Sequence, residues 1–195
     1  MDGMSQFPDK YFELAIVDPP YGIGVDKMSM FDGAKKQQRH KEYDDIIPDK
    51  IYFNELFRIS KNKIIWGGNY FDLGPCRCFL QWDKIQSFSG ADFELAWTNF
   101  EKPAKIFRMA RCQAYGKGTI HPTQKPVDLY RWLLQNYAKK DDKILDTHVG
   151  SGSSIIACIE EGFDFCGFEI DEDYYNAAQK RIKEFSDQLR LFVTA

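Results

Sequence analysis

Residues 143–171 read KILDTHVGSGSSIIACIEEGFDFCGFEID, and this stretch decides the fold. The apolar residues of 143–146 predict a buried strand, and the small residues of 147–153 predict a loop. Residues 154–161 have the apolar spacing of a helix, and residues 165–169 predict a second strand. A strand, a helix and a strand in this order form a parallel unit with a right-handed crossover, so we expect an α/β fold.

The loop and the strand ends of this unit indicate a ligand site. Gly150 and Gly152 let backbone amides come close to a molecule bound at the start of the helix. Glu169 ends the second strand 19 residues beyond Gly150, where an acid can bind two ribose hydroxyls. Asp146 and Asp171 also stand at strand ends. Carboxylates at these places disfavour a phosphate and favour hydroxyls and a positively charged sulfonium.

The third glycine of the dinucleotide-binding fingerprint is missing, because Ser153 and Ser154 follow Gly152. This argues against a pyrophosphate cradle and against a nicotinamide-dependent oxidoreductase. The loop instead suits an adenosyl group without phosphates. A plain strand–helix–strand unit with a tight turn has the same pattern, and the loop alone does not distinguish the two.

A second apolar run, residues 14–17, precedes Asp18, Pro19, Pro20 and Tyr21. Open α/β sheets bind ligands at the carboxyl ends of their strands. The prolines remove backbone donors and fix the turn. The Asp18 carboxylate and the Pro19 carbonyl then form a rigid pair of acceptors beside the aromatic ring of Tyr21. They suit a planar ring with an amino group, although a proline-rich turn with an exposed acid fits equally well.

Residues 121–126 read HPTQKP and precede a predicted helix at 127–138. Pro126 suits the first turn of that helix. Lys125 and the free amides at the helix start form a plausible site for an anion such as a carboxylate.

Two basic segments suggest contact with nucleic acid. The first is a long loop, residues 22–46, which we expect to be a mobile flap beside the active site. Its cations are Lys35, Lys36, Arg39 and Lys41. The second, residues 99–120, reads as a short recognition-like edge ribbon. Its cations are Lys102, Lys105, Arg108 and Arg111. The alternative for the first segment is a run of charges that is merely solvated. The alternative for the second is an exposed sheet edge whose Lys and Arg residues prevent aggregation.

The remaining chain predicts a helix at residues 48–59, whose apolar face includes Ile51, and a last helix at 172–189 followed by a short strand at 191–193. Four further strands are predicted at residues 63–66, 77–82, 93–97 and 104–109. The turns after these strands fit one shared ligand face, and they also fit ordinary strand ends.

Composition limits the class of protein. The 195 residues are 44% apolar and 15% aromatic, which predicts one globular domain over residues 1–195. The net charge of −3 excludes a general polyanion binder, so any nucleic-acid contact must be local. No apolar run approaches the ~18 residues of a membrane helix. The five cysteines match no zinc spacing, which indicates reduced thiols in the cytoplasm and no metal.

Three stretches in order resemble the DNA amino-methyltransferases, which methylate the exocyclic amine of adenine or cytosine with S-adenosylmethionine. Residues 18–21 look like the catalytic motif, residues 146–153 with 167–171 are similar to the cofactor loop and ribose-binding acid, and residues 121–126 resemble the segment that contacts the methionine part. The catalytic motif comes first, as in the permuted β group and its small phage-type members. The resemblance implies a Rossmann-like methyltransferase fold with a mixed, mostly parallel sheet and helices on both faces.

The resemblance also implies site residues. The catalytic motif is Asp18, Pro19, Pro20 and Tyr21. The implied cofactor-binding residues are Asp18, His121, Thr123, Lys125, Pro126, Asp146, Thr147, Val149, Gly150, Ser151, Gly152, Ser153, Glu169, Ile170 and Asp171. In the implied mechanism Asp18 and the Pro19 carbonyl accept hydrogen bonds from the two N–H groups of the amine. The flipped base stacks on Tyr21.

The chain departs from the family in three places. Thr147 and His148 replace the usual Pro-Phe after the first cofactor Asp. The sequence starts too late for all of the strand that usually precedes the catalytic one, so either Asp2 is its remnant or upstream residues are missing. The recognition segment is too short for an independent recognition domain. Either the flap at residues 22–46 or a second subunit in a homodimer supplies further DNA contacts, or the sequence specificity is low.

The resemblance favours adenine as the target, because it implies Asp more often than Ser at the first position of the catalytic motif in adenine enzymes, and that position is Asp18 here. Cytosine-N4 methylation is the alternative. RNA, a glutamine amide in a protein, and a non-catalytic binding module are further alternatives. DNA is the expected partner, and the cytoplasm of a bacterium, with a bacterial or phage-encoded restriction–modification role, is the expected setting.

Overall fold

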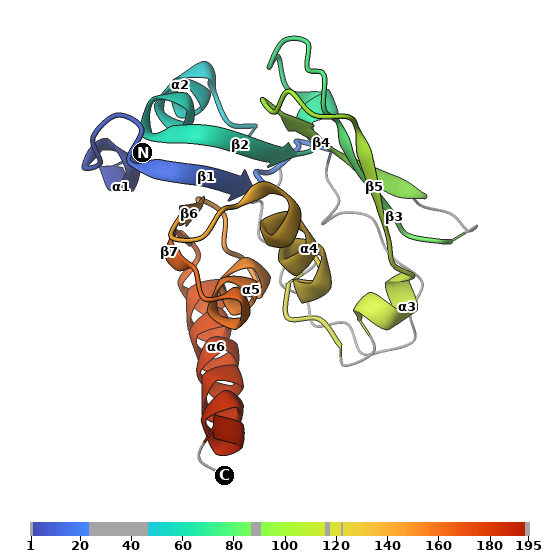
Figure 1. The fold of residues 1–195 in the computed structure, drawn as a ribbon, viewed down its shortest axis with the longest axis vertical. Helices are drawn as coiled ribbons and strands as arrows, with labels where there is room; N and C mark the ends of the chain where they lie inside the picture. The colour runs from blue at the N-terminus through green and yellow to red at the C-terminus, as the bar shows by residue number, and fades with distance from the viewer. Residues whose placement is uncertain (1, 24–46, 87–90, 116–117, 122, 194–195) are drawn as a thin grey trace.

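The computed structural model describes residues 2–23, 47–86, 91–115, 118–121 and 123–193. One seven-stranded sheet with the order β5-β3-β4-β2-β1-β6-β7 organises the fold (Figure 1). The strands are β1 (Phe12–Val17), β2 (Ser60–Trp66), β3 (Leu80–Asp83), β4 (Phe93–Thr98), β5 (Lys105–Arg108), β6 (Lys143–Asp146) and β7 (Asp164–Gly167). All neighbours pair in parallel except β4, which runs antiparallel to both β2 and β3. The sheet is therefore mixed and mostly parallel, as expected.

Helices cover both faces of the sheet. They are α1 (Asp2–Ser5), α2 (Lys50–Ile59), the 3-10 turn η3 (Gly68–Tyr70), α3 (Arg111–Ala114), α4 (Val127–Tyr137), α5 (Ser153–Glu161) and α6 (Glu172–Val193). One buried cluster joins Leu14 and Ile16 of β1 to α4 and α5, and a second joins Ala15 and Val17 to α1 and α2. Burial on both faces explains why β1 is continuously apolar rather than alternating.

Strand direction decides which residues reach the ligand edge. β1 and β2 run in parallel with Val17 opposite Ile65, so residues after both strands lie at one edge of the sheet. β4 is reversed, and Asp83 at the end of β3 pairs with Phe93 at the start of β4. Of the two interpretations of the turn after residues 93–97, the ordinary strand end is therefore correct, because the beginning of β4 lies at the ligand edge instead.

The structure corrects three further expectations. Residues 191–193 continue α6 and form no strand. The residues after Asp2 form the short helix α1 rather than a strand remnant. Helix α2 begins at Lys50, because the side chain of Asp49 caps it by accepting the backbone N–H of Tyr52 at 2.8 Å.

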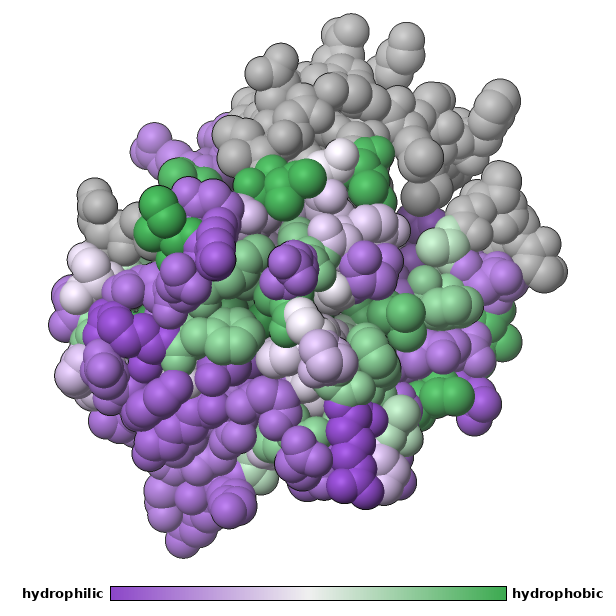
Figure 2. Space-filling view, turned by 90° about the horizontal axis from the view of Figure 1, so that it is seen from above, coloured by the Kyte–Doolittle hydropathy of each residue, from purple (hydrophilic) through white to green (hydrophobic). Residues whose placement is uncertain are grey.

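The predicted apolar face of α2 is right for Tyr52, Leu56 and Ile59, which are buried, but Ile51 is 63% exposed. Exposed apolar groups of this kind are common on protein surfaces. Figure 2 likewise shows hydrophobic residues scattered among hydrophilic ones on the face seen from above.

Candidate active site

A cavity of about 500 Å³ opens at the carboxyl edge of the parallel strands, and all three predicted motifs contribute to its wall. Asp18 and Tyr21 come from the turn after β1, His121 and Lys125 from the segment before α4, and Gly150 from the loop after β6. The other predicted residues that line it are Pro19, Pro20, Thr123, Val149, Ser151, Glu169, Ile170 and Asp171. The structure thus brings together residues that lie far apart in the sequence.

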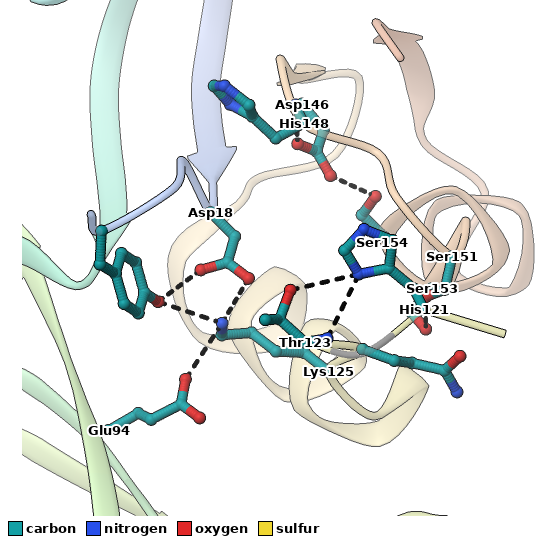
Figure 3. Close-up of polar contacts among 12 residues, drawn as sticks. Asp18, Glu94, His121, Thr123, Lys125, Asp146, His148, Ser151, Ser153 and Ser154 are labelled. Carbon is teal, nitrogen blue, oxygen red and sulfur yellow. Dashed lines mark hydrogen bonds and ion pairs between the residues drawn. The ribbon is translucent and has the colours of Figure 1, made fainter. Parts of the chain in front are cut away.

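The Asp18 carboxylate has a partner on each oxygen (Figure 3). The Tyr21 hydroxyl donates to Oδ1 at 2.5 Å, and the ammonium group of Lys125 donates to Oδ2. The Lys125 side chain is only 3% exposed and that of Asp18 12%. Burial raises the pKa of Asp18, and the attraction of Lys125 opposes this rise without cancelling it.

Lys125 is not the open anion site that the sequence suggested, because a second carboxylate also holds it. Its Nζ lies 3.0 Å from Oε2 of Glu94, and Nζ of Lys84 lies 2.7 Å from Oε1 of the same carboxylate. Burial favours a higher pKa for Glu94, but Lys125 and Lys84 outweigh it and lower that pKa to about 2. Sequence reasoning missed Glu94, and its only signal was an acid inside an otherwise apolar strand.

Tyr21 packs against Gly67, which follows β2, and against Tyr70 of η3. Gly67 has a φ of +66°, and a Cβ at this position would come within 2.1 Å of the Tyr21 ring. The Tyr21 ring also stacks on Tyr70, with centroids 5.1 Å apart and planes inclined by 17°. The ring that the sequence offers to a target base therefore packs against Tyr70 in this structure, and Tyr70 is 47% exposed.

Asp146 fixes the loop after β6. Its Oδ1 accepts the backbone N–H of His148 at 2.9 Å, and its Oδ2 accepts the Ser154 hydroxyl at 2.5 Å. One carboxylate thus joins the start of the loop to α5. Burial raises the pKa of Asp146 to about 7, and the two hydrogen bonds only partly oppose this.

Glu169 fixes the far side of the same loop. Its Oε2 accepts the Gly150 N–H at 2.8 Å, and its Oε1 accepts the Asp171 N–H at 2.9 Å. Each oxygen has a second lone pair that can accept a ligand hydroxyl. The next residue, Ile170, is fully exposed beside it on the cavity wall.

The serines of the loop are buried. Ser151 and Ser153 share a hydrogen bond of 3.0 Å between their hydroxyls, and Gly152 is the left-handed residue that precedes α5. Arg181 of α6 donates to the Ser151 carbonyl at 2.8 Å. Arg181 thus joins the loop to α6, and sequence reasoning missed this residue.

Thr147 and His148, where the chain departs from the family, join the loop to α2. The Tyr52 hydroxyl shares a 2.7 Å hydrogen bond with Thr147 Oγ1, which lies 2.9 Å from His148 Nδ1. Burial lowers the pKa of His148 to about 4, so the imidazole is neutral at pH 7. A second cavity of about 320 Å³ lies beside these residues and reaches Gly3 and Met4.

The segment before α4 is ordered by its own histidine. Thr123 donates its backbone N–H to His121 Nδ1 at 3.3 Å, and the His121 ring packs edge-on against Tyr174 at 4.3 Å between centroids. Pro126 precedes α4 as its cap residue rather than lying within the first turn.

The predicted nucleic-acid contacts are only partly described. Lys35, Lys36, Arg39 and Lys41 lie outside the described residues. β5 is the edge strand of the sheet, as the edge-ribbon interpretation predicts, and Lys105 and Arg108 are exposed on it. Lys102 donates to the Asn136 carbonyl at 2.9 Å, and Arg111 lies 5.6 Å from the Tyr115 ring centroid. These four side chains are not among the residues that line the cavity.

Within the described ranges, no group of three or more His, Cys, Asp or Glu residues could hold a metal ion. Of the helices in this part of the chain, none combines the length and the apolar character needed to cross a membrane.

Comparison with known proteins gives consistent relatives. A family model described as DNA methylase matches residues 56–180. The predicted methylase YubD of Escherichia coli (strain K12) is 34% identical over an alignment of 210 positions, which covers 92% of this chain and 85% of YubD. The type II methyltransferase M2.MboI of Moraxella bovis is 22% identical over 97% of this chain and 87% of its own.

Solved structures share the fold. The M1.HpyAVI–SAM complex has a TM-score of 0.60 at 21% identity and covers 88% of this chain and 90% of its own. The PvuII DNA methyltransferase, which is specific for cytosine N4, has a TM-score of 0.58 at 14% identity, with 94% and 86% covered. The chain therefore has the Rossmann-like methyltransferase fold that the sequence predicts.

Proposed function

The chain belongs to the N6/N4 DNA methylase family, and from this premise we propose that it methylates the N6 amino group of adenine in DNA with S-adenosylmethionine. The observation that carries the proposal is one cavity lined by both the Asp18 motif and the Gly150–Glu169 loop. An acceptor for an amine and a site for an adenosyl group are thus adjacent.

The cavity wall fits S-adenosylmethionine, which supplies a methyl group on a positively charged sulfur. Glu169 would accept the ribose hydroxyls, because each oxygen keeps a lone pair after bonding to a loop amide. The carboxylates of Asp18, Glu169 and Asp171 face the same space and favour a cation over a phosphate. Val149, Gly150 and Ser151 would line the cofactor along its loop, whereas Thr147 lines the second cavity.

The target amine is a weak nucleophile because its lone pair is shared with the ring. Asp18 and the Pro19 carbonyl would accept hydrogen bonds from its two N–H groups and turn the lone pair towards the methyl group. The new N–C bond would replace the bond between the methyl group and sulfur, which leaves S-adenosylhomocysteine, and the nitrogen would lose one proton after methylation. This mechanism relies on positioning and electrostatics, so Asp18 need not be a strong base. Both Asp18 oxygens already have one partner, and each retains lone-pair capacity for the amine.

A base inside a duplex cannot reach this cavity and must be flipped out. Tyr21 is the proposed stacking surface for the flipped base. Tyr70 stacks on one face of Tyr21, so a base that uses that face must displace Tyr70. The basic edge at β5 and the loop at residues 22–46 are the proposed phosphate contacts, and a second subunit is one way to extend the short recognition segment. Because its proposed substrate is DNA, we propose the cytoplasm of a bacterium as the setting of the enzyme.

Adenine is proposed because the catalytic motif begins with Asp18. The cytosine-N4 alternative is kept because a structural relative, PvuII, has that specificity. The test is to incubate duplex DNA with methyl-labelled S-adenosylmethionine, digest the DNA and identify the methylated nucleoside by mass spectrometry. N6-methyladenine supports the proposal, whereas N4-methylcytosine establishes the alternative. Cofactor binding without any methylated nucleoside contradicts both and favours the non-catalytic module.

A further inference from the structure

Four buried or half-buried charges of alternating sign connect β3 to the active site. They run from Lys84 through Glu94 and Lys125 to Asp18, with contacts of 2.7 Å and 3.0 Å at Glu94. The side chains are 13%, 23%, 3% and 12% exposed in that order. Figure 3 shows the part from Glu94 through Lys125 to Asp18. Charges this poorly solvated interact strongly, so each one affects its neighbours.

We propose that Glu94 is a positioning residue that shares Lys125 with Asp18 and thereby keeps the Asp18 carboxylate available to the target amine. The proposal rests on the function proposed above. Without Glu94, Lys125 would have Asp18 as its single carboxylate partner and would bind it more tightly. A carboxylate bound that tightly is a poorer acceptor for an arriving N–H donor.

The geometry supports sharing rather than simple packing. Lys125 Nζ contacts one oxygen of each carboxylate, and it also lies 5.4 Å from the centroid of the Trp66 ring. The ammonium group is therefore fixed between two anions, one in the turn after β1 and one on β4. Lys84 occupies only the other oxygen of Glu94, which leaves Oε2 directed at Lys125.

The sign of the effect follows from the charges around Asp18. The titratable groups that act on it or sense it are Tyr21, Glu94, Lys125, Tyr52, Tyr115, Tyr130 and Asp146. Glu94→Gln removes a like charge and leaves Asp18 as the carboxylate partner of Lys125, so the pKa of Asp18 should fall. Lys84→Met leaves Glu94 dependent on Lys125 and removes a positive charge, so the pKa of Asp18 should rise. A role of Glu94 in packing alone, without charge coupling to Asp18, predicts no shift in either variant.

The experiment measures the Asp18 carboxyl directly. Chain labelled with ¹³C in the aspartate carboxyls is titrated by NMR, with Asp18→Asn used to assign the resonance. Methylation rates are measured over the same pH range. For Glu94→Gln we expect the titration midpoint to fall by about one pH unit and kcat to fall roughly tenfold. Binding of S-adenosylmethionine should stay within about twofold, because the change acts on the amine acceptor. For Lys84→Met the midpoint should rise.

The matched control is Glu55→Gln. Glu55 is also an acid in an ion pair, but its partner Arg58 contacts Asp9, before β1, at the opposite end of that strand from Asp18. An unmoved Asp18 titration in both Glu94→Gln and Lys84→Met, or shifts of the same sign, would overturn the proposal. If Glu94→Gln fails to fold, the sign of the Lys84→Met shift decides. Wild-type protein that methylates nothing refutes the proposed function, while the NMR titration still decides whether Lys125 is shared.

Discussion

The ammonium group of Lys125 contacts the carboxylate of Asp18, although 107 positions separate these residues in the chain. The contact joins the turn after β1 to the segment before α4 and leaves both side chains almost fully buried. It explains why the two motifs must fold together before the site exists. It also makes Lys125 part of the environment of the amine acceptor rather than a free cation for the cofactor.

Lys125→Met should therefore disable the acceptor. Burial and the repulsion of Glu94 would then raise the pKa of Asp18 further, so the ionised fraction at pH 7 falls and returns as the pH rises. We expect methylation at pH 7 to fall ~100-fold, with the acid limb of the pH–rate profile moved to higher pH. Initial rates from pH 5 to 9 measure this. Lys139→Met, at an exposed lysine after α4, is the control, and an unmoved acid limb in Lys125→Met would contradict the assignment.

Asp18→Ala should separate methylation from cofactor binding. The variant loses one of the two acceptors of the amine, while the Gly150–Glu169 contact that orders the cofactor loop stays intact. We expect the methylation rate to fall ~1,000-fold or more and the affinity for S-adenosylmethionine to persist in isothermal titration. Full activity would exclude Asp18 from the mechanism. Tyr21→Ala should behave alike, because it removes both the stacking ring and the partner of Asp18 Oδ1.

Asp146 should make stability depend on pH in an unusual direction. Burial raises its pKa from the ordinary 3.8 to about 7, so between these values the folded chain keeps a proton that the unfolded chain has lost. This group therefore stabilises the fold less and less as the pH rises from about 4 to about 7. Asp146→Asn should remove that slope.

Urea unfolding of wild type and Asp146→Asn at half-unit pH steps tests this prediction. The difference between the two free energies of unfolding isolates Asp146, because His121 and His148 titrate in both proteins. A difference that is flat from pH 4 to 7 would show that Asp146 is ionised in the folded state throughout.

Local sequence patterns predicted the strands that build the site, since β1 and β6 are short apolar runs. Strand β1 ends just before Asp18, and β6 ends at Asp146. Parallel pairing then places both ends at one edge, so the shared cavity followed from the motifs. The direction of β4 is a long-range property that its sequence does not encode, and for that reason Glu94 was missed. The strand expected at residues 191–193 was wrong because three apolar residues fit either a strand or the last turn of a long helix.

Gly67 and Gly74 allow a direct test of the Tyr21 pocket. Both have a positive φ, of +66° and +74°, so alanine is strained at either position. At Gly67 the new Cβ would also come within 2.1 Å of the Tyr21 ring, whereas at Gly74 it meets no described atom within 4 Å.

We expect Gly74→Ala to cost ~1 kcal/mol of stability in urea unfolding and to leave methylation unchanged. Gly67→Ala should cost at least ~2 kcal/mol and lower kcat by roughly tenfold or more, because Tyr21 must move and release Asp18 Oδ1. Equal stability losses with unchanged rates in both variants would mean that the position of the Tyr21 ring is not critical for the reaction. A loss of rate confined to Gly67→Ala would tie the geometry of the Tyr21–Asp18 hydrogen bond to methyl transfer.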